Sequence, residues 1–487
     1  MKSKDYSKYL WLLAVIILAL ILIIKLIQLS KMIYFYPSYD FSSHIANLFF
    51  LKEYGFHGIA PNWYHGLVVL RYYPPLFFFF AYLFYSIISN LQLAFYISFI
   101  GVILIGFFGI HLLGNVLKFS IIKRLFLFLF FYANPITIPW FYNIGRVPEM
   151  LGWTLLFYLL SLLFAYKNKK LDKKFFIFLI IILTLILLAH ILILVLALFL
   201  VFGLFLIKDN KEKIKIIISL ISVPLLSSFW LFDFIKNVNT LNYAPSYRLY
   251  SHPTEVIYSM LIPLVFLGII YLYKKVKKIN KKEFLFYIPL LLISFLYLSN
   301  LFLYIPILKS IEPRTYGILL MLISTILILD LKPNKRALNL ISIGVLILSL
   351  TIATVVLVRY NQIDFPLYSE QEIGTLNLIP LVKEKFIAVG KNGDVNKRHI
   401  YAYGAVKYNT TTPLGWGIQQ VSKRIEGIQE EIKISLNTKN CERFTNIIKK
   451  LEVKEIISHK NKCDFLKSCN LYEKKESGQY CLLKTIS

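Results

Sequence analysis

Residues 175–207 decide the fold class, and they read FFIFLIIILTLILLAHILILVLALFLVFGLFLI. Apolar runs of 18 or more residues are typical of helices that cross a lipid bilayer. As one helix this stretch would measure about 50 Å, which exceeds the hydrocarbon core of a bilayer. We therefore predict two short membrane spans that turn near His190.

Most of the chain before residue 358 has the same apolar character. The 487 residues have a mean hydropathy of +0.65 and are 57% hydrophobic, more than a soluble protein of this length would average. Aromatic residues make up 16% of the chain, and many lie near the ends of apolar runs, where amphipathic rings favour the headgroup zone. The composition predicts a polytopic α-helical membrane protein whose main partner is the lipid bilayer.

The net charge of +28 has a topological explanation. In a soluble protein it would suggest a nucleic-acid partner. Here most basic residues lie in short loops between apolar runs, where they orient the chain with those loops in the cytoplasm, so we expect no nucleic-acid partner. The clusters are Lys2/Lys4/Lys8, Lys118/Lys123/Arg124, 167–174, 208–215, 274–282 and Lys332/Lys335/Arg336.

If all six clusters are cytoplasmic, an even number of crossings separates each cluster from the next. This parity predicts about eleven spans, a cytoplasmic N-terminus and an extracytoplasmic C-terminus, in a multi-pass protein of the plasma membrane. The first apolar run, residues 9–29, lacks the small-residue cleavage site of a signal peptide, so we expect it to stay as a span. The spans are roughly 9–29, 92–114, 124–142, 147–166, 174–189, 191–207, 214–234, 255–273, 284–301, 314–331 and 337–358.

Residues 74–117 are apolar enough for two spans, but parity allows only one. We assign the crossing to residues 91–117. Pro74 and Pro75 then open a helix at the outer surface, because proline is tolerated in a first helical turn.

Composition changes abruptly after Val358. We expect a transmembrane domain over residues 1–358, with a long first outer loop at 30–91, and an extracytoplasmic domain over 359–487. In that tail, short apolar runs predict strands at 385–389 and 455–458, and periodic runs predict helices at 423–434 and 442–451. The expectation is a small α/β domain.

All four cysteines lie in this tail: Cys441, Cys463, Cys469 and Cys481. An even number of cysteines in a small extracytoplasmic domain permits two disulfides, and the sequence leaves all three pairings open.

The first outer loop holds the candidate site residues Asp40, His44 and Tyr73. Asp40 precedes a predicted amphipathic helix at about 42–54, and taken alone it is best interpreted as a helix N-cap. Later outer segments add ionisable residues, which are costly near a membrane and usually face a cavity. These further candidates are Arg146, Glu149, His190, His252, Glu312 and Arg314.

Arginines that converge on a carboxylate suit a phosphate-linked substrate, because Arg makes bidentate phosphate contacts and a carboxylate accepts a proton from a hydroxyl. An interfacial cation near lipid phosphates is the plain alternative for Arg146 and Arg314. Several short motifs hold these residues: Asp40-x-x-x-His44, Gly58-x-x-Pro61-x-Trp63, Tyr73-Pro74-Pro75-Leu76, Gly145-Arg146-x-x-Glu149 and Glu312-Pro313-Arg314.

The order of these motifs resembles the GT-C superfamily of integral-membrane glycosyltransferases. Members carry an acidic residue in a long first outer loop, a following YPPL-type juxtamembrane helix, and often an outer C-terminal domain. The nearest likeness is to membrane proteins labelled 6-pyruvoyl-tetrahydropterin-synthase-related. The resemblance covers most of the chain to about residue 330.

The resemblance implies a transferase that moves a sugar from a polyprenyl-phosphate carrier to a glycan, lipid or protein acceptor on the outer face. Asp40 would be the base or the carboxylate that orients the acceptor, and Arg314, with Arg146, would hold the phosphate. Many GT-C enzymes have a paired-acid motif in the first loop, which Asp40 lacks. A divalent cation, Mg²⁺ or Mn²⁺, therefore stays open as a cofactor, with Asp40 as its ligand.

Two other functions remain open. A transporter or flippase of lipid-linked glycans would need a polar path through the spans, which offer few ionisable residues. A non-catalytic membrane protein would bind a glycan or a partner through its tail.

Overall fold

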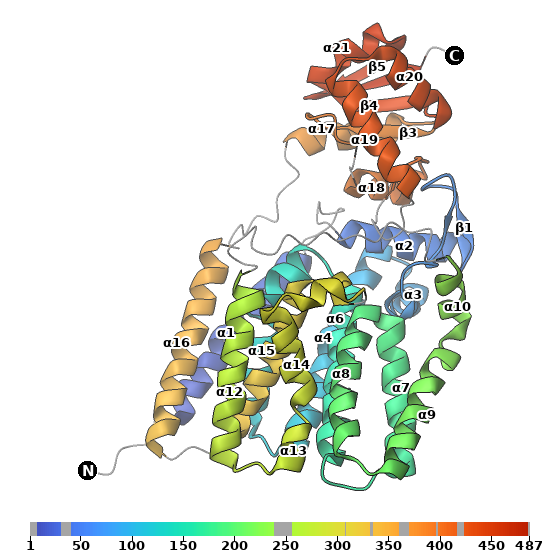
Figure 1. Ribbon diagram of the computed structural model, residues 1–487. Coiled ribbons are helices and arrows are strands. Elements are labelled where there is room, and N and C mark those ends of the chain that lie inside the picture. Colours follow the sequence, from blue (N-terminus) through green and yellow to red (C-terminus); the bar gives the residue numbers. More distant parts are fainter. Residues whose placement is uncertain are drawn as a thin grey trace.

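The computed structural model describes residues 7–30, 40–237, 256–306, 308–331, 335–359, 370–395, 398–415 and 423–485. A bundle of apolar helices carries a smaller domain, built from the C-terminal residues, at one end (Figure 1). The start of α1 lies at the opposite end of the bundle (Figure 1).

Six helical segments within the described residues are long and apolar enough to cross a membrane. Each matches a span predicted from the sequence, and their exposed apolar side chains point to a membrane protein. They are α1 (Ser7–Ser30), α4 (Leu91–Val116), α6 (Val147–Tyr166), Ser259–Lys277, which comprises most of η3 (Ile257–Leu261) and α12 (Ile262–Lys277), α15 (Pro313–Asp330), and Asn339–Val356 within α16 (Lys335–Arg359).

Residues 175–207 form two helices, as predicted. Helix α7 (Lys173–Ala189) ends and α8 (Ile191–Ile207) begins at His190, whose extended backbone turns the chain. The His190 N–H donates to the carbonyl of Ile186 at 2.8 Å, which closes the last turn of α7. Each helix has 17 residues, so each is shorter than a standard span.

The predicted span at 124–142 is not one continuous helix in the structure. Helix α5 (Ile121–Tyr132) stops after 12 residues, and a π-helical turn, η1 (Ile138–Asn143), follows. The side-chain oxygen of Asn134 accepts backbone N–H groups of Ile136 and Thr137 at 2.8 and 3.1 Å, which turns the chain out of the helix.

Two further predicted spans are interrupted. Helices α9 (Asn210–Leu226) and α10 (Ser228–Asn237) form a pair bent by 77°, close to Pro224, which removes a helical donor. Residues 284–301 give α14 (Ile288–Leu298), separated from α13 (Lys281–Leu285) and followed by the 3₁₀ turns η4 (Leu301–Tyr304) and η5 (Leu308–Ser310). Eleven spans therefore stays a prediction.

The chain segments that follow α6, α8 and α12 lie at the end of the bundle opposite the C-terminal domain (Figure 1). Lys167, after α6, pairs with Glu283 of α13 at 2.6 Å, and Lys277, at the end of α12, pairs with Asp330 at 2.8 Å. Lys208 donates to the carbonyl of Tyr166 at 2.8 Å. Three of the sequence clusters thus share one end of the molecule.

The first outer loop packs across the other end. Helix α2 (Phe41–Tyr54) lies under the C-terminal domain, and the short strands β1 (Ile59–Ala60) and β2 (Leu67–Val68) form a hairpin after it (Figure 1). Helix α3 (Leu76–Ile88) has 13 residues and would rise only about 20 Å, in keeping with a helix that does not cross.

The C-terminal domain is α/β, with its own core between Leu378 and Leu483. Its sheet has the order β3-β4-β6-β5, with β3 parallel to β4 and the other pairs antiparallel. The expected strands and helices are present. The strands are β3 (Phe386–Val389), β4 (Glu455–His459), β5 (Leu471–Ser477) and β6 (Tyr480–Thr485), and the helices are α17 (Glu370–Leu378), the 3₁₀ turn η6 (Ile379–Leu381), α18 (Arg398–Tyr408), α19 (Lys423–Asn437), α20 (Cys441–Lys450) and α21 (Lys460–Ser468).

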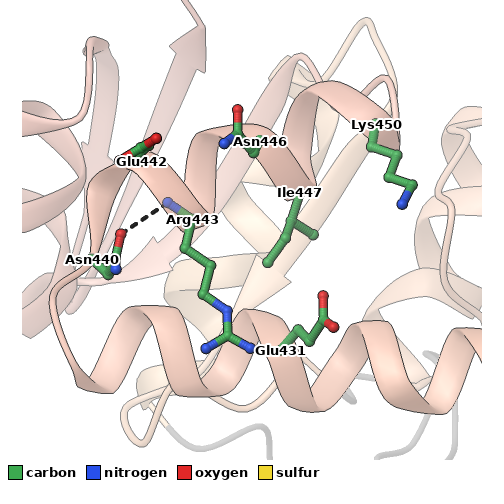
Figure 2. Close-up of a pocket in the computed structure, with 7 residues that line it drawn as sticks. All are labelled: Glu431, Asn440, Glu442, Arg443, Asn446, Ile447 and Lys450. Carbon is green, nitrogen blue, oxygen red and sulfur yellow. Dashed lines mark hydrogen bonds between the residues drawn. The ribbon is translucent and has the colours of Figure 1, made fainter.

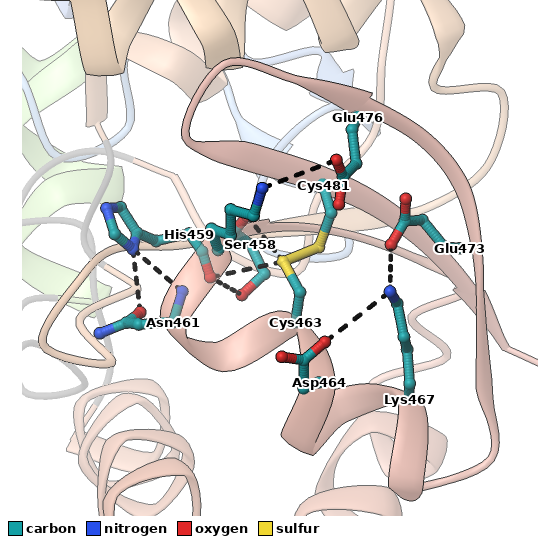
Figure 3. Close-up of a disulfide and its surroundings, with 10 residues drawn as sticks. Ser458, His459, Asn461, Cys463, Asp464, Lys467, Glu473, Glu476 and Cys481 are labelled. Carbon is teal, nitrogen blue, oxygen red and sulfur yellow. Dashed lines mark hydrogen bonds and ion pairs between the residues drawn. A yellow bond between two sulfur atoms is a disulfide. The ribbon is translucent and has the colours of Figure 1, made fainter.

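Of the three possible cysteine pairings, the structure has one. Cys463 of α21 joins Cys481 of β6, which ties the helix to the sheet (Figure 3). Cys441 at the start of α20 joins Cys469 just after α21. The Cα atoms of the two pairs are 6.4 and 5.1 Å apart, within the usual span of a disulfide.

The C-terminal domain docks on the first outer loop. Helix α18 packs against α2, and the side chain of Asn62 donates to Asn409 and to the carbonyl of Thr410 at 2.9 and 3.0 Å. The N–H of Thr412 donates back to the carbonyl of Asn62 at 2.9 Å. Paired buried amides leave few alternative registers, so they fix the position of the domain.

Candidate functional site

Asp40 stands at the start of α2 without capping it. Its N–H donates to the carbonyl of Ile144 at 2.9 Å, which ties the first outer loop to the segment before α6. Among the described residues its carboxylate accepts no hydrogen bond from the first turn of α2. Instead one carboxylate oxygen lies 3.3 Å from Nε of Arg146. The side chain of Asp40 is only 11% exposed, so this ion pair is largely sheltered from water.

A glycine makes this close approach possible. Gly145 has a φ of +87°, in the left-handed region that favours glycine. A Cβ at this position would lie 2.9 Å from the backbone nitrogen of Phe41 and 2.7 Å from its ring. The glycine thus lets the start of α2 reach Arg146.

Arg146 contacts three carboxylates, one through each of its nitrogens. Besides the contact of Nε with Asp40, Nη2 donates to Glu312 at 2.8 Å and Nη1 lies 3.6 Å from Glu149. Burial by itself lowers the pKa of Arg146, but the three carboxylates more than offset this and hold it above its usual value. Arg146 therefore stays charged.

Prolines begin the two helices that supply these partners. Arg146 precedes α6, in which Pro148 occupies the first turn, and Glu312 precedes α15, which begins at Pro313. Proline suits these positions because the first helical N–H groups have no partner within the helix. Both helices start at the end of the bundle near α2.

Glu149 is buried and satisfied by neutral donors. Its side chain is 2% exposed, and one of its oxygens accepts from the indole N–H of Trp140 at 3.0 Å and of Trp153 at 3.3 Å. The hydroxyl of Thr315, on α15, donates to the same oxygen at 3.4 Å. Glu149 thereby joins η1, α6 and α15.

Trp140 also brings the second arginine into the cluster. The guanidinium carbons of Arg146 and Arg314 lie 4.3 and 4.5 Å from the centroid of its ring. Cations over an indole are stabilised by the electron-rich face of the ring. Asp40, Arg146, Trp140 and Arg314 therefore form one continuous cluster, built from three distant parts of the chain.

Two histidines lie buried beside the arginine cluster. The ring of His44, on α2, is 5.4 Å from the ring of Tyr73. Burial, followed by the positive charge of Arg146, lowers the pKa of His44 to about 3, with His190 adding a smaller effect. Burial and Arg146 likewise lower the pKa of His190 to about 3. Both rings are neutral at physiological pH.

The structure brings together most of the candidate residues. A charge interaction with Tyr73 also helps to raise the pKa of Arg146, so Tyr73 lies in the same neighbourhood. His252 lies outside the described residues. Sequence reasoning missed Trp140, Trp153 and Thr315, because each sits in an apolar stretch where nothing distinguishes it from a lipid-facing residue.

No three His, Cys, Asp or Glu side chains within the described ranges form a group that would ligate a metal ion. Around Arg146, the guanidinium stands between the carboxylates of Asp40, Glu149 and Glu312.

A separate cavity of about 400 Å³ lies between α19 and α20 of the C-terminal domain, away from the arginine cluster (Figure 2). Acidic, basic and amide side chains line it, with one apolar residue. Its lining residues are Glu431, Asn440, Glu442, Arg443, Asn446, Ile447 and Lys450.

No family model and no curated protein sequence matches the chain. Its fold resembles the cryo-EM structure of the arabinofuranosyltransferase AftD from Mycobacteria, with a TM-score of 0.59 and 12% identity, over 96% of this chain and 40% of that one. A mutant of AftD gives a TM-score of 0.56 at 12% identity, over 96% and 41%.

The archaeal oligosaccharyltransferase AglB from Archaeoglobus fulgidus, in complex with an inhibitory peptide and a dolichol-phosphate, gives a TM-score of 0.48 at 12% identity, over 99% of this chain and 75% of that one. The chain spans about two fifths of the length of AftD. At this identity the likeness concerns the fold alone, which the chain shares with part of AftD.

Proposed function

We propose that the chain is a membrane glycosyltransferase that moves a sugar from a polyprenyl-phosphate-linked donor to an acceptor on the outer face of the plasma membrane. The observation that carries this proposal is the sheltered carboxylate of Asp40, which is held by Arg146 rather than by the helix it precedes. The fold shared with AftD supports the same reaction class.

In this reaction Asp40 is the base. Its carboxylate accepts the proton of an acceptor hydroxyl while the hydroxyl oxygen attacks the anomeric carbon of the donor sugar. The bond from that carbon to the carrier phosphate breaks, and its electron pair leaves on the phosphate oxygen. Arg314 stabilises the departing phosphate, because a guanidinium matches two phosphate oxygens at once.

The acceptor approaches from the side of the C-terminal domain. This requires a cytoplasmic N-terminus and an extracytoplasmic C-terminal domain, as the basic clusters predict. The common position of Lys167, Lys208 and Lys277 at the far end of the bundle supports that orientation. The narrower likeness to proteins labelled 6-pyruvoyl-tetrahydropterin-synthase-related adds nothing to the choice of substrate.

The test is transfer by the purified protein in lipid. A panel of polyprenyl-phosphate sugars that includes a pentofuranose, the sugar class named for AftD, is supplied with glycan, lipid and peptide acceptors. We expect transfer from one donor, and a loss of about a hundred-fold or more in the variant Asp40→Asn. Failure of the wild type to transfer sugar from any donor in the panel would count against the proposal.

A second candidate is a non-catalytic glycan-binding protein. The polar cavity between α19 and α20 favours it, since amide and charged side chains make paired hydrogen bonds to sugar hydroxyls. Glycan binding that Arg443→Ala abolishes, together with full function of Asp40→Asn, would select this alternative over the transferase.

A further inference from the structure

Three carboxylates from distant parts of the chain converge on one cation. Asp40 precedes α2, Glu149 lies in the first turn of α6, and Glu312 precedes α15. Their oxygens lie 3.3, 3.6 and 2.8 Å from the Nε, Nη1 and Nη2 atoms of Arg146. Each nitrogen of the guanidinium therefore serves a different acid.

Such a gathering of acids needs a positive charge at its centre. Carboxylates that share one place repel one another, and a protein relieves this repulsion with a proton, a metal ion or a basic side chain. Oxygen donors converging from several elements are the usual ligands of Mg²⁺ or Mn²⁺. Here the charge belongs to Arg146, whose planar group carries five N–H donors in fixed directions.

The arginine and a metal ion compete for the same oxygens. A divalent cation requires oxygens at about 2.0 to 2.6 Å from one point, so the three acids would have to close around it. The guanidinium fills the space between them, and its charge repels a second cation. The indole N–H groups of Trp140 and Trp153 hold the carboxylate of Glu149 in place. The ring of Trp140 also packs against the guanidinium of Arg146, so neighbouring side chains fix the position of both groups.

We propose that the guanidinium of Arg146 takes the place of a divalent cation at this site, as a permanent internal counter-ion that positions Asp40 and makes the site independent of added metal. Arg146 is then a positioning residue. Its three nitrogens already lie within 2.8 to 3.6 Å of carboxylates, so contact with the donor phosphate falls to Arg314. The catalytic part of this inference rests on the proposed transferase function, whereas the metal-binding part does not.

The test uses Mn²⁺ as a probe, followed by electron paramagnetic resonance of the full chain in lipid nanodiscs. We expect the wild-type protein to bind no Mn²⁺ at these carboxylates, so the amount of bound Mn²⁺ should be the same in the wild type and in Asp40→Asn. The variant Arg146→Ala leaves the three acids without their cation, and we expect it to bind one Mn²⁺ at concentrations at least ten-fold below any at which the wild type takes up the ion. The double variant Arg146→Ala, Glu312→Gln removes one acid and should lose this gain.

Two measurements make the proposal falsifiable even if Arg146→Ala folds poorly. Wild-type transferase activity should persist in excess EDTA, and guanidinium chloride at millimolar concentration should stabilise Arg146→Ala against heating by refilling the gap. Stoichiometric Mn²⁺ on the wild type that disappears in Asp40→Asn would overturn the inference. A folded Arg146→Ala with wild-type Mn²⁺ binding would also overturn it. Because Mn²⁺ binding needs no sugar donor, these results are separable from a failure to find transferase activity.

Discussion

The guanidinium of Arg146 donates a hydrogen bond of 2.8 Å to Glu312, although 166 residues separate them in the sequence. This bond joins the start of α6 to the start of α15, and Asp40 meets the same arginine from the first outer loop. The site therefore exists only when three remote segments of the chain pack together.

The variant Asp40→Asn should lose about a hundred-fold or more in turnover while it still folds, because the amide cannot accept the proton. Turnover of the purified protein in lipid measures the loss of activity, and its melting temperature shows whether the variant still folds. Asp172 provides the matched control, since its side chain does cap a helix by accepting the N–H of Phe175 at 2.9 Å. Asp172→Ala should lower the melting temperature slightly, through loss of the cap, and leave turnover unchanged. Near-normal turnover in Asp40→Asn would refute the role of the carboxylate.

Lysine should replace Arg314 poorly. It keeps the charge but lacks the planar group that lies 4.5 Å from the Trp140 centroid and fits a phosphate with two donors. We expect the KM for the lipid-linked donor to rise about ten-fold in Arg314→Lys. Arg71→Lys is the control, because Arg71 pairs with Asp233 in another part of the outer surface. Equal donor affinity in Arg314→Lys and wild type would exclude this contact.

The ring and the N–H of Trp140 should contribute separately to the affinity for the lipid-linked donor. Trp140→Phe keeps an aromatic face for the two arginines but loses the bond to Glu149, which is worth about 1 kcal/mol or more for a charged acceptor. Trp140→Leu loses both. We expect donor affinity to fall in the order wild type, Phe, Leu, with about ten-fold between the extremes. A Leu variant with normal affinity would show that the ring only fills space.

Acid should destabilise the folded protein through its buried histidines. His44 and His190 have pKa values of about 3 in the folded state, below the ordinary value of 6.5, so the unfolded chain binds more protons between these limits. Their contribution to stability is present above pH 6.5 and is lost as the pH falls toward 3. The melting temperature should therefore drop on acidification, and less steeply in His190→Gln. An identical slope in that variant would contradict the assignment.

The C-terminal domain should contain both disulfides in the full-length protein purified from membranes. Mass spectrometry of peptides from unreduced protein should link Cys463 to Cys481 and Cys441 to Cys469. Removing the first pair as Cys463→Ser, Cys481→Ser should cost roughly 3 kcal/mol, because the bond restricts the unfolded chain. Equal masses with and without reduction and alkylation would show that the thiols are free.

Much of the fold follows from the sequence alone, because local features determine it. The 33-residue stretch 175–207 is too long for one crossing, and His190 is the ionisable residue within it at which the chain turns. Alternation and periodicity likewise sufficed for β3, β4, α19 and α20, since an element of this size is specified by its own side chains.

Other features depended on packing that no local pattern contains. The break at Asn134 arose from side-chain bonds to the backbone inside an otherwise apolar run. The cysteine pairing was one of three that the spacing allowed, and only the positions of α20, α21 and β6 selected it. Docking of α18 on α2 is equally invisible in the sequence.

The candidate site divides along the same line. The sequence by itself predicts which acids and arginines share one side of the membrane, because charge and hydropathy order the loops and spans. Only the tertiary structure decided that Arg146 faces three carboxylates and shares the ring of Trp140 with Arg314. Such contacts between remote residues depend on how α2, α6 and α15 pack, and packing is a property of the whole core rather than of any one segment.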